Sequence, residues 1–160
     1  MCKAKSPSCC VTTQNFVKII QKAKGSNVTS DKFPIINGHY ILMNFGSKKR
    51  LVMIDTGASL SMVSLRFLKS LDPNLSSKIV PSKIPYMKMV DGTTTPILGT
   101  INLKFYLDHS QANFEFYVLP NMRYSVVLGL DFFHQFDCIF DYGSQDFTTK
   151  TPVRTVREVI

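Results

Sequence analysis

One short segment of the sequence has the residue types needed for acid–base chemistry. Positions 52–59 read Val-Met-Ile-Asp-Thr-Gly-Ala-Ser, so that Asp55 ends an apolar run and small residues follow it. A carboxylate at the end of a buried strand is costly unless it is hydrogen-bonded or shares a proton. The small residues permit a tight turn and a close approach to a ligand. We therefore predict that Asp55 opens a tight loop and is a candidate for acid–base chemistry, although an Asp that merely ends a strand is common. The other residues of this loop are Thr56, Gly57, Ala58 and Ser59.

A second segment further along the chain would support that loop. Positions 126–133 read Val-Val-Leu-Gly-Leu-Asp-Phe-Phe, which indicates an apolar strand that ends in glycine and leads into a helix. Gly129 allows close backbone packing, so Leu128 and Gly129 are predicted to lie under the Asp55 loop. The alternative is an ordinary strand-to-helix junction with Asp131 near the helix start.

These two strings, in this order, resemble the two signatures of the retroviral-type aspartic proteases, or retropepsins. The second string is most similar to proteases of Ty3/Gypsy-like long-terminal-repeat retrotransposon polyproteins, and the resemblance covers roughly Phe33 to Lys150. It implies that Asp55 is the catalytic carboxylate, that Thr56 ties two Asp loops across a dimer axis, and that Gly57 contacts the substrate through its backbone.

The resemblance also implies a flap, a hairpin that closes over a bound peptide. The segment 88–96 fits this role because glycine and small threonines suit a mobile tip. A plain surface hairpin is the alternative. The predicted tip consists of Val90, Asp91, Gly92 and Thr93.

Short apolar runs separated by Gly, Pro and Asn turns predict an all-β, mostly β, fold. With the resemblance, the expected architecture is a single-lobe retropepsin-like acid protease barrel with one short helix. The run 51–54 is apolar on both faces and is expected deep in the fold. Strands are expected at 40–45, 51–54, 86–90, 97–107, 113–119, 126–128, 138–140 and 147–149, and helical turns at 64–71 and 130–135.

The sequence contains one candidate catalytic Asp rather than two. Asp91-Gly-Thr has the residues in the wrong order, and Asp141-Tyr-Gly has no small hydroxyl residue after the acid. Aspartic protease chemistry uses two carboxylates that share a proton, one as base and one as acid. The second carboxylate is therefore expected from an identical chain in a twofold homodimer. This chemistry needs no metal ion or organic cofactor.

The ends of the chain differ in composition from its middle. Residues 1–30 contain five lysines and no acidic residue, and the net charge of the whole chain is +8. We predict a flexible basic extension at 1–30 with a short helix over 16–23, the protease domain at 31–150, and a tail or dimer strand at 151–160. The basic extension offers weak contact with nucleic acid, and a solvated leader is the alternative.

Cysteine usage and hydropathy indicate the cellular compartment of the protein. The four cysteines fit neither a disulfide framework nor a zinc site, and Cys138 lies among apolar neighbours as a core residue would. We expect a reducing, cytoplasmic location, including virus-like particles, and no membrane partner because no long apolar run occurs.

Three functions remain open. The first is an aspartic endopeptidase that matures a retroelement polyprotein. The second is a host-adopted retropepsin that cuts cellular proteins, and the third is a catalytically silent dimerisation or peptide-binding module on the same fold. The expected partners are a second copy of the chain and a polypeptide substrate.

Overall fold

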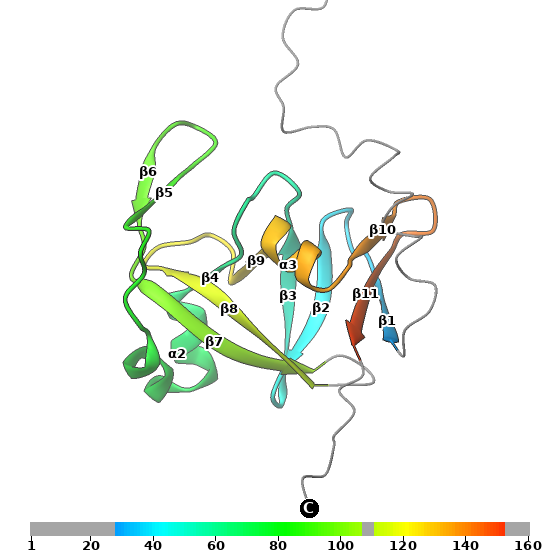
Figure 1. Cartoon of the computed structure of the whole chain (residues 1–160), viewed down its shortest axis with the longest axis horizontal. Helices are drawn as coiled ribbons and strands as arrows, with labels where there is room; N and C mark the ends of the chain where they lie inside the picture. Colours follow the sequence, from blue (N-terminus) through cyan, green and yellow to red (C-terminus); the bar gives the residue numbers. More distant parts are fainter. Residues whose placement is uncertain (1–27, 107–110, 153–160) are drawn as a thin grey trace, which may run out of the picture.

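The computed structural model describes residues 28–106 and 111–152. These residues form a closed β-barrel, a separate three-stranded sheet, a short hairpin and a few short helices (Figure 1). The barrel strands follow the spatial order β2-β3-β9-β4-β8-β7. Their bounds are β2 (Tyr40–Phe45), β3 (Lys48–Ile54), β9 (Val126–Leu128), β4 (Met62–Ser64), β8 (Gln111–Leu119) and β7 (Gly99–Tyr106).

The pairing of β3 with β9 decides where the two sequence motifs meet. The two strands are parallel, with Met53 opposite Val127 and Ile54 opposite Leu128. Parallel strands end at the same edge of a sheet. The residues that follow them, Asp55 and Gly129, therefore lie side by side although they are far apart in the sequence.

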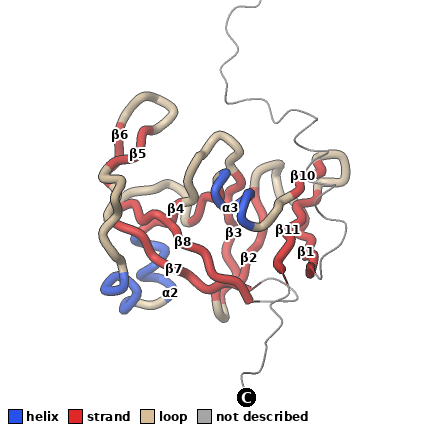
Figure 2. Tube along the Cα trace, viewed as in Figure 1, coloured by secondary structure: helices blue, strands red, loops and turns tan. Residues whose placement is uncertain are grey.

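Two smaller elements lie on opposite sides of the barrel. The three-stranded sheet has the order β1 (Val28–Pro34), β11 (Asp146–Pro152), β10 (Ile139–Asp141). The hairpin of β5 (Tyr86–Lys88) and β6 (Thr94–Pro96) projects from the other side (Figure 2).

The helices are short and pack on the barrel. They are α2 (Leu65–Leu71), the 3-10 helix η1 (Pro73–Lys78) and α3 (Leu130–Gln135). Ser64 caps α2, because its hydroxyl accepts a hydrogen bond of 3.0 Å from the Phe67 N–H. Within the described residues, no helix is both long and apolar enough to cross a membrane.

Aromatic side chains fill the core between α3 and the barrel. Phe132 lies at the centre, with its ring centroid 4.6 Å from that of Phe136 and 5.2 Å from that of Phe114. Such edge-to-face and tilted contacts add to the stability gained from burial. Because α3 begins directly after Gly129, this packing fixes the position of the second motif.

The fold confirms the mostly-β prediction, with several corrections. Two short α-helices are present rather than one, both where helical turns were expected. The run 51–54 is not buried on both faces: Val52 is fully buried, whereas Leu51 is 51% exposed. Leu51 lies opposite Leu42 on the outer face of the β2–β3 pair, because alternate residues of a strand face opposite sides.

Two strands extend across the predicted boundaries of the protease domain. Strand β1 begins at Val28, inside the predicted extension 1–30, and β11 ends at Pro152, inside the predicted tail 151–160. The pairing of these two strands brings the two ends of the domain together. The predicted helix over 16–23 lies outside the described residues.

Candidate active site

Asp55 lies in a tight turn directly after β3. Its side chain is half-buried, and its Oδ1 accepts a hydrogen bond of 2.9 Å from the Gly57 N–H. Its backbone N–H donates to the Leu128 carbonyl at 3.0 Å, which ties the turn to β9. The carboxylate is thus held at the edge of the barrel with one oxygen occupied by the loop itself.

Gly129 packs against this loop from beneath. A Cβ atom at this position would lie 2.7 Å from the Ala58 carbonyl oxygen and 2.8 Å from that of Leu60. Backbone oxygens cannot move aside as flexible side chains can, so the contact requires glycine. The next residue continues the contact, because the Leu130 N–H donates to the Ala58 carbonyl at 2.8 Å.

Ser61 and Asp131 fasten the loop to the start of α3. The Ser61 hydroxyl donates to Asp131 Oδ1 at 2.6 Å and accepts from the Gly129 N–H at 2.8 Å. Asp131 Oδ2 accepts from the Ser61 N–H at 3.0 Å. Hydrogen bonds to a charged carboxylate are stronger than neutral ones. These three hydrogen bonds tie the loop to the start of α3, and Ser61 and Asp131 are 70 positions apart in the sequence.

Sequence reasoning missed the role of this pair. Ser61 was not singled out, and Asp131 was considered only as a residue near a helix start. A usable signal was present in the second motif, because an acid placed just after a strand-to-helix glycine can accept hydrogen bonds from a neighbouring loop.

A cavity of about 330 Å³ opens above the Asp55 loop. The hairpin β5–β6 forms its other side, with residues 86–90 facing the loop. Concave sites of this size accommodate several side chains of a ligand. On the barrel side the lining residues are Asp55, Gly57, Ala58, Ser59, Leu60 and Met62.

The tip of the hairpin is a compact turn. The Met89 N–H donates to the Thr93 carbonyl at 2.7 Å, and Gly92 has a φ angle of +86°, which favours glycine. Asp91 Oδ1 accepts from the Thr93 hydroxyl at 2.6 Å and from its N–H at 2.9 Å. These two hydrogen bonds lower the pKa of Asp91 from its ordinary value. Val90 beside the turn is fully exposed.

Comparisons with known proteins give the family and the fold of the chain. Residues 51–155 match the sequence profile of the PEG10/RTL1 protease domain. The chain belongs to the PEG10/RTL1 protease domain family. No curated protein sequence matches it significantly.

Two crystal structures share the fold of this protease domain. One is the retroviral protease-like domain of Ddi1 from Leishmania major, with a TM-score of 0.56, 18% identity, and coverage of 71% of this chain and 91% of that chain. The other is a retropepsin-like aspartic protease from Rickettsia conorii, with a TM-score of 0.51, 18% identity, and coverage of 79% of this chain and 94% of that chain. The family model thus identifies a protease domain, and its fold is the one seen in these two retropepsin-like structures.

The structure brings most of the predicted site residues of this protease domain around one cavity. Asp55, the loop residues 57–59 and Val90 line it, and Leu128 and Gly129 lie beneath the loop. Thr56 is exposed and is not part of the lining. Positions 91–93 form the hairpin tip beyond it.

The floor of the site continues into a second apolar cluster, separate from the main core. Its buried members are Met62, Leu119 and Val127. Met62, Ala58 and Met87 belong both to this cluster and to the lining of the cavity, so the two are continuous. The partly buried members of the cluster are Met53, Ala58, Met87, Ile97, Met122 and Tyr124.

Two other ionisable residues lie away from the cavity. Cys138 is a free, buried cysteine, and burial raises the pKa of its thiol well above the ordinary value. It belongs to the main core cluster, as the sequence indicated. Asp141 lies at the β10–β11 turn, where hydrogen bonds from Ser144 lower the pKa of its carboxyl. Neither residue lines the cavity.

Proposed function

We propose that this protease domain is an active aspartic endopeptidase in which two identical chains each contribute Asp55. The observation that carries the proposal is the half-buried Asp55 carboxylate on the floor of a cavity that a hairpin covers. The oxygen Oδ1 is hydrogen-bonded within the loop, and Oδ2 is left for a water molecule or for the partner carboxylate. A cavity lined mostly by apolar or small side chains, with one carboxylate on its floor, suits the hydrolysis of an extended peptide.

The reaction needs one carboxylate of the pair ionised and the other protonated. The ionised carboxylate takes a proton from water, whose oxygen attacks the scissile carbonyl carbon, while the protonated one donates its proton to the carbonyl oxygen. The tetrahedral intermediate then collapses: one of its hydroxyl groups returns a proton to the ionised carboxylate, the C–N bond breaks, and the leaving nitrogen takes up the proton of the other carboxyl group, which leaves the pair with one proton again. Two adjacent carboxylates share one proton because their like charges oppose double ionisation.

A homodimer completes the site in this proposal. One chain places a single Asp at the cavity, and the exposed Thr56 and Gly57 next to it are free to meet the same loop of a partner. In a twofold dimer the same surface patch is used by both chains. The two loops would then face each other across the axis, with Thr56 joining them.

The substrate in this proposal is a polypeptide. A segment of a retroelement polyprotein, including the precursor of this domain, is the first choice, and a cellular protein is the second. A reducing, cytoplasmic compartment suits the unpaired Cys138 thiol.

The decisive experiment is cleavage of a mixed peptide pool at mildly acidic pH. Wild-type chain, Asp55→Asn and wild type with a statine-type inhibitor are run in parallel over a range of protein concentrations. We expect wild type to cut, and Asp55→Asn to lose about a thousandfold or more in rate because the catalytic ionisable group is gone. Specific activity should rise with concentration where the dimer is dissociated.

Mixed dimers test the shared site directly. Excess Asp55→Asn chain added to wild type should suppress cleavage, because a mixed dimer has one ionisable carboxylate. Activity that persists in Asp55→Asn, or that is untouched by excess variant chain, contradicts the proposal. Peptide binding without cleavage at high concentration would identify a peptide-binding module instead.

A further inference from the structure

The segment before β9 borders the proposed peptide-binding site. Met122 and Tyr124 pack on the second apolar cluster together with Ala58 and Met87, which line the Asp55 cavity. The same segment is joined to α2, because the Ser64 N–H donates to the Ser125 carbonyl at 3.0 Å. A peptide that extends beyond the cavity along this cluster therefore reaches residues 122–124.

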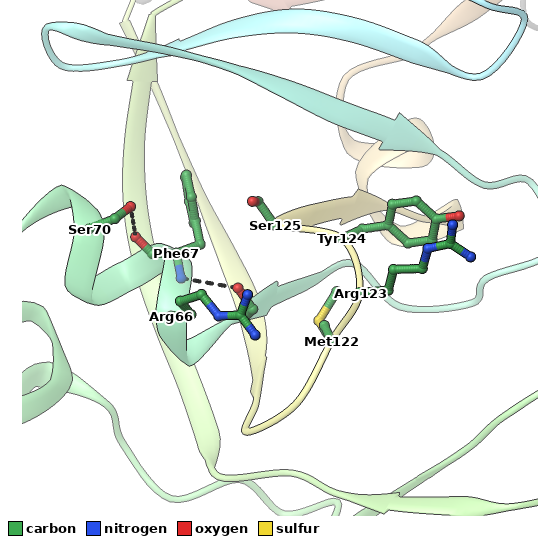
Figure 3. Close-up of a pocket in the computed structure, with 8 residues that line it drawn as sticks. Arg66, Phe67, Ser70, Met122, Arg123, Tyr124 and Ser125 are labelled. Carbon is green, nitrogen blue, oxygen red and sulfur yellow. Dashed lines mark hydrogen bonds between the residues drawn. The ribbon is translucent and has the colours of Figure 1, made fainter.

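Arg123 lies at this border, and its guanidinium group packs over an aromatic ring. Its guanidinium carbon is 5.8 Å from the ring centroid of Tyr124 (Figure 3). The Tyr124 ring is itself placed by Tyr40, with ring centroids 6.3 Å apart. A guanidinium over an aromatic face is attracted by the ring, and the N–H groups at its edge remain able to bind a carboxylate in bidentate fashion.

Among the residues that the structure describes, Arg123 has no acidic partner. Within 28–106 and 111–152, the ion pair found is Lys32 with Asp146 on the separate sheet, and no carboxylate lies within 4.0 Å of the Arg123 guanidinium. Arg123 and Arg66 both line a hollow of about 110 Å³ between α2 and this segment, and no acidic residue lines it (Figure 3).

Apart from Asp55, the charged side chain among the described residues that line the neighbouring cavity is basic, like Arg123. Lys88 lines it from the hairpin, and Asp55 is its one acidic lining residue. Side chains of one charge around a cleft attract ligands of the opposite charge. The site as a whole therefore combines an apolar floor with a positive border.

We propose that Arg123, positioned by Tyr124, is a specificity-determining residue that binds an acidic side chain of the substrate peptide outside the scissile pair. The inference rests on the proposed peptidase function and adds a substrate class to it, namely peptides with apolar residues at the cleaved bond and a glutamate or aspartate nearby. Arg123 acts in substrate binding and takes no part in proton transfer.

The test uses peptides built around an apolar scissile pair taken from the pool. Glu, Gln or Lys is placed in turn at each position outside the pair, and kcat/KM is measured for each peptide. We expect one position at which wild type prefers Glu over Gln by roughly three- to tenfold, as for a partly exposed charge-assisted contact. The preference should appear in KM rather than in kcat, because the contact is made equally in the ground and transition states.

Variants separate this contact from a general charge effect. Arg123→Gln should abolish the preference for Glu, and Arg123→Glu should shift it toward Lys. Lys104→Glu, at an exposed position of β7 outside both lining sets, makes the same charge change and should leave the preference intact. Thermal unfolding of each variant checks that the fold is retained.

The outcomes distinguish this inference from the peptidase proposal. Cleavage by wild type without a preference for Glu, or an unchanged preference in Arg123→Glu, overturns the inference and leaves the peptidase intact. If no peptide is cleaved, the peptidase proposal fails, and fluorescence anisotropy of labelled Glu and Gln peptides with Asp55→Asn then tests the subsite by binding. Equal binding of the two peptides would overturn it.

Discussion

The Asp55 loop and the β5–β6 hairpin face each other across one cavity but are held in opposite ways. The loop is fastened to distant parts of the chain through Gly129, Ser61 and Asp131. The hydrogen bonds of the hairpin tip are local, within 89–93, and each of its strands is three residues long. Long-range contacts hold the loop side of the cavity rigidly, whereas few contacts restrain the hairpin side.

This difference fits the division of work in the proposed reaction. Catalytic carboxylates must be kept within a fraction of an ångström of the productive geometry, which long-range contacts can achieve. A cover over a peptide must open and close, which weakly restrained hairpins do. Changes beneath the loop should therefore lower stability and activity together, whereas changes in the hairpin should lower activity alone.

The largest effect is expected at Gly129. In Gly129→Ala the added Cβ would meet two backbone oxygens at 2.7 and 2.8 Å, so the Asp55 loop must shift. We expect a loss of about 1–3 kcal/mol in the free energy of unfolding, as for other overpacked sites. Cleavage should fall about a hundredfold, since small misplacements of catalytic groups have effects of this size. Urea denaturation and kcat/KM measure the two losses.

Gly143→Ala is the matched control. A Cβ at Gly143 meets a side-chain oxygen, Asp141 Oδ1, at 3.2 Å in an exposed turn far from the cavity in the fold. We expect a change in unfolding free energy within about 0.5 kcal/mol and unaltered cleavage. Equal effects of the two substitutions would show that the loop has no special dependence on Gly129.

The next effect is expected for the Ser61–Asp131 connection. Ser61→Ala leaves the Gly129 N–H and Asp131 Oδ1 without their hydroxyl partner, which should cost about 1–3 kcal/mol of unfolding free energy. A double-mutant cycle with Asp131→Asn should show a coupling energy of about 0.5 kcal/mol or more. Ser77→Ala, which removes an exposed hydroxyl bonded to the Asn74 carbonyl, is the control and should have little effect. Additive losses would mean that the two residues act independently.

Strands and turns that depend only on neighbouring residues were predicted well from the sequence. Strands β2 and β9 were predicted at their observed bounds, and the strand predicted at 113–119 lies within β8. A strand's period and the residues of a tight turn are local properties, so they can be read from a few neighbouring residues. The flap segment that the resemblance implied, 88–96, falls within the hairpin of β5 and β6.

The parts that were missed depend on contacts between distant residues. The Ser61–Asp131 contact exists because β4 lies between β9 and β8, and the local pattern does not reveal this order. Leu51 was expected to be buried because it is apolar, yet the register with Leu42 puts it on the outer face. The place of Arg123 beside the site depends likewise on how the segment before β9 packs.

A smaller effect is expected at the hairpin tip. Gly92 has a φ angle of +86° and open space around it, so Gly92→Ala strains the turn without a clash. The strain should cost about 1 kcal/mol. Because the hairpin can relieve this strain by rearranging locally, the melting temperature of the domain should change little. We expect kcat/KM to fall about threefold to tenfold, because that strain disfavours the closed position of the tip.

Gly46 offers a close control for this substitution. It has a φ angle of +65° and open space, and it lies in the turn between β2 and β3, outside the lining of the cavity. Gly46→Ala should lower the free energy of unfolding by about 1 kcal/mol with unchanged cleavage, because this turn joins two paired barrel strands. The idea of a weakly restrained cover fails if Gly92→Ala instead lowers stability and leaves cleavage unaltered.

The smallest effect concerns the pH response of the hairpin tip. Hydrogen bonds from Thr93 depress the pKa of Asp91, so the ionised carboxylate stabilises the folded turn. Because the pKa is depressed in the folded state, the ionised carboxylate contributes stability at pH values above its ordinary pKa of 3.8. This contribution is lost as the pH falls through the lower pKa that Asp91 has in the folded protein. In Thr93→Val the hydroxyl is gone and the Asp91 pKa should rise toward 3.8, whereas Thr93→Ser should keep it low. NMR titration of the Asp91 side chain measures this directly. Identical titration curves for wild type and Thr93→Val would show that the tip is not held by this contact, and the hairpin would then owe its shape to its two short strands alone.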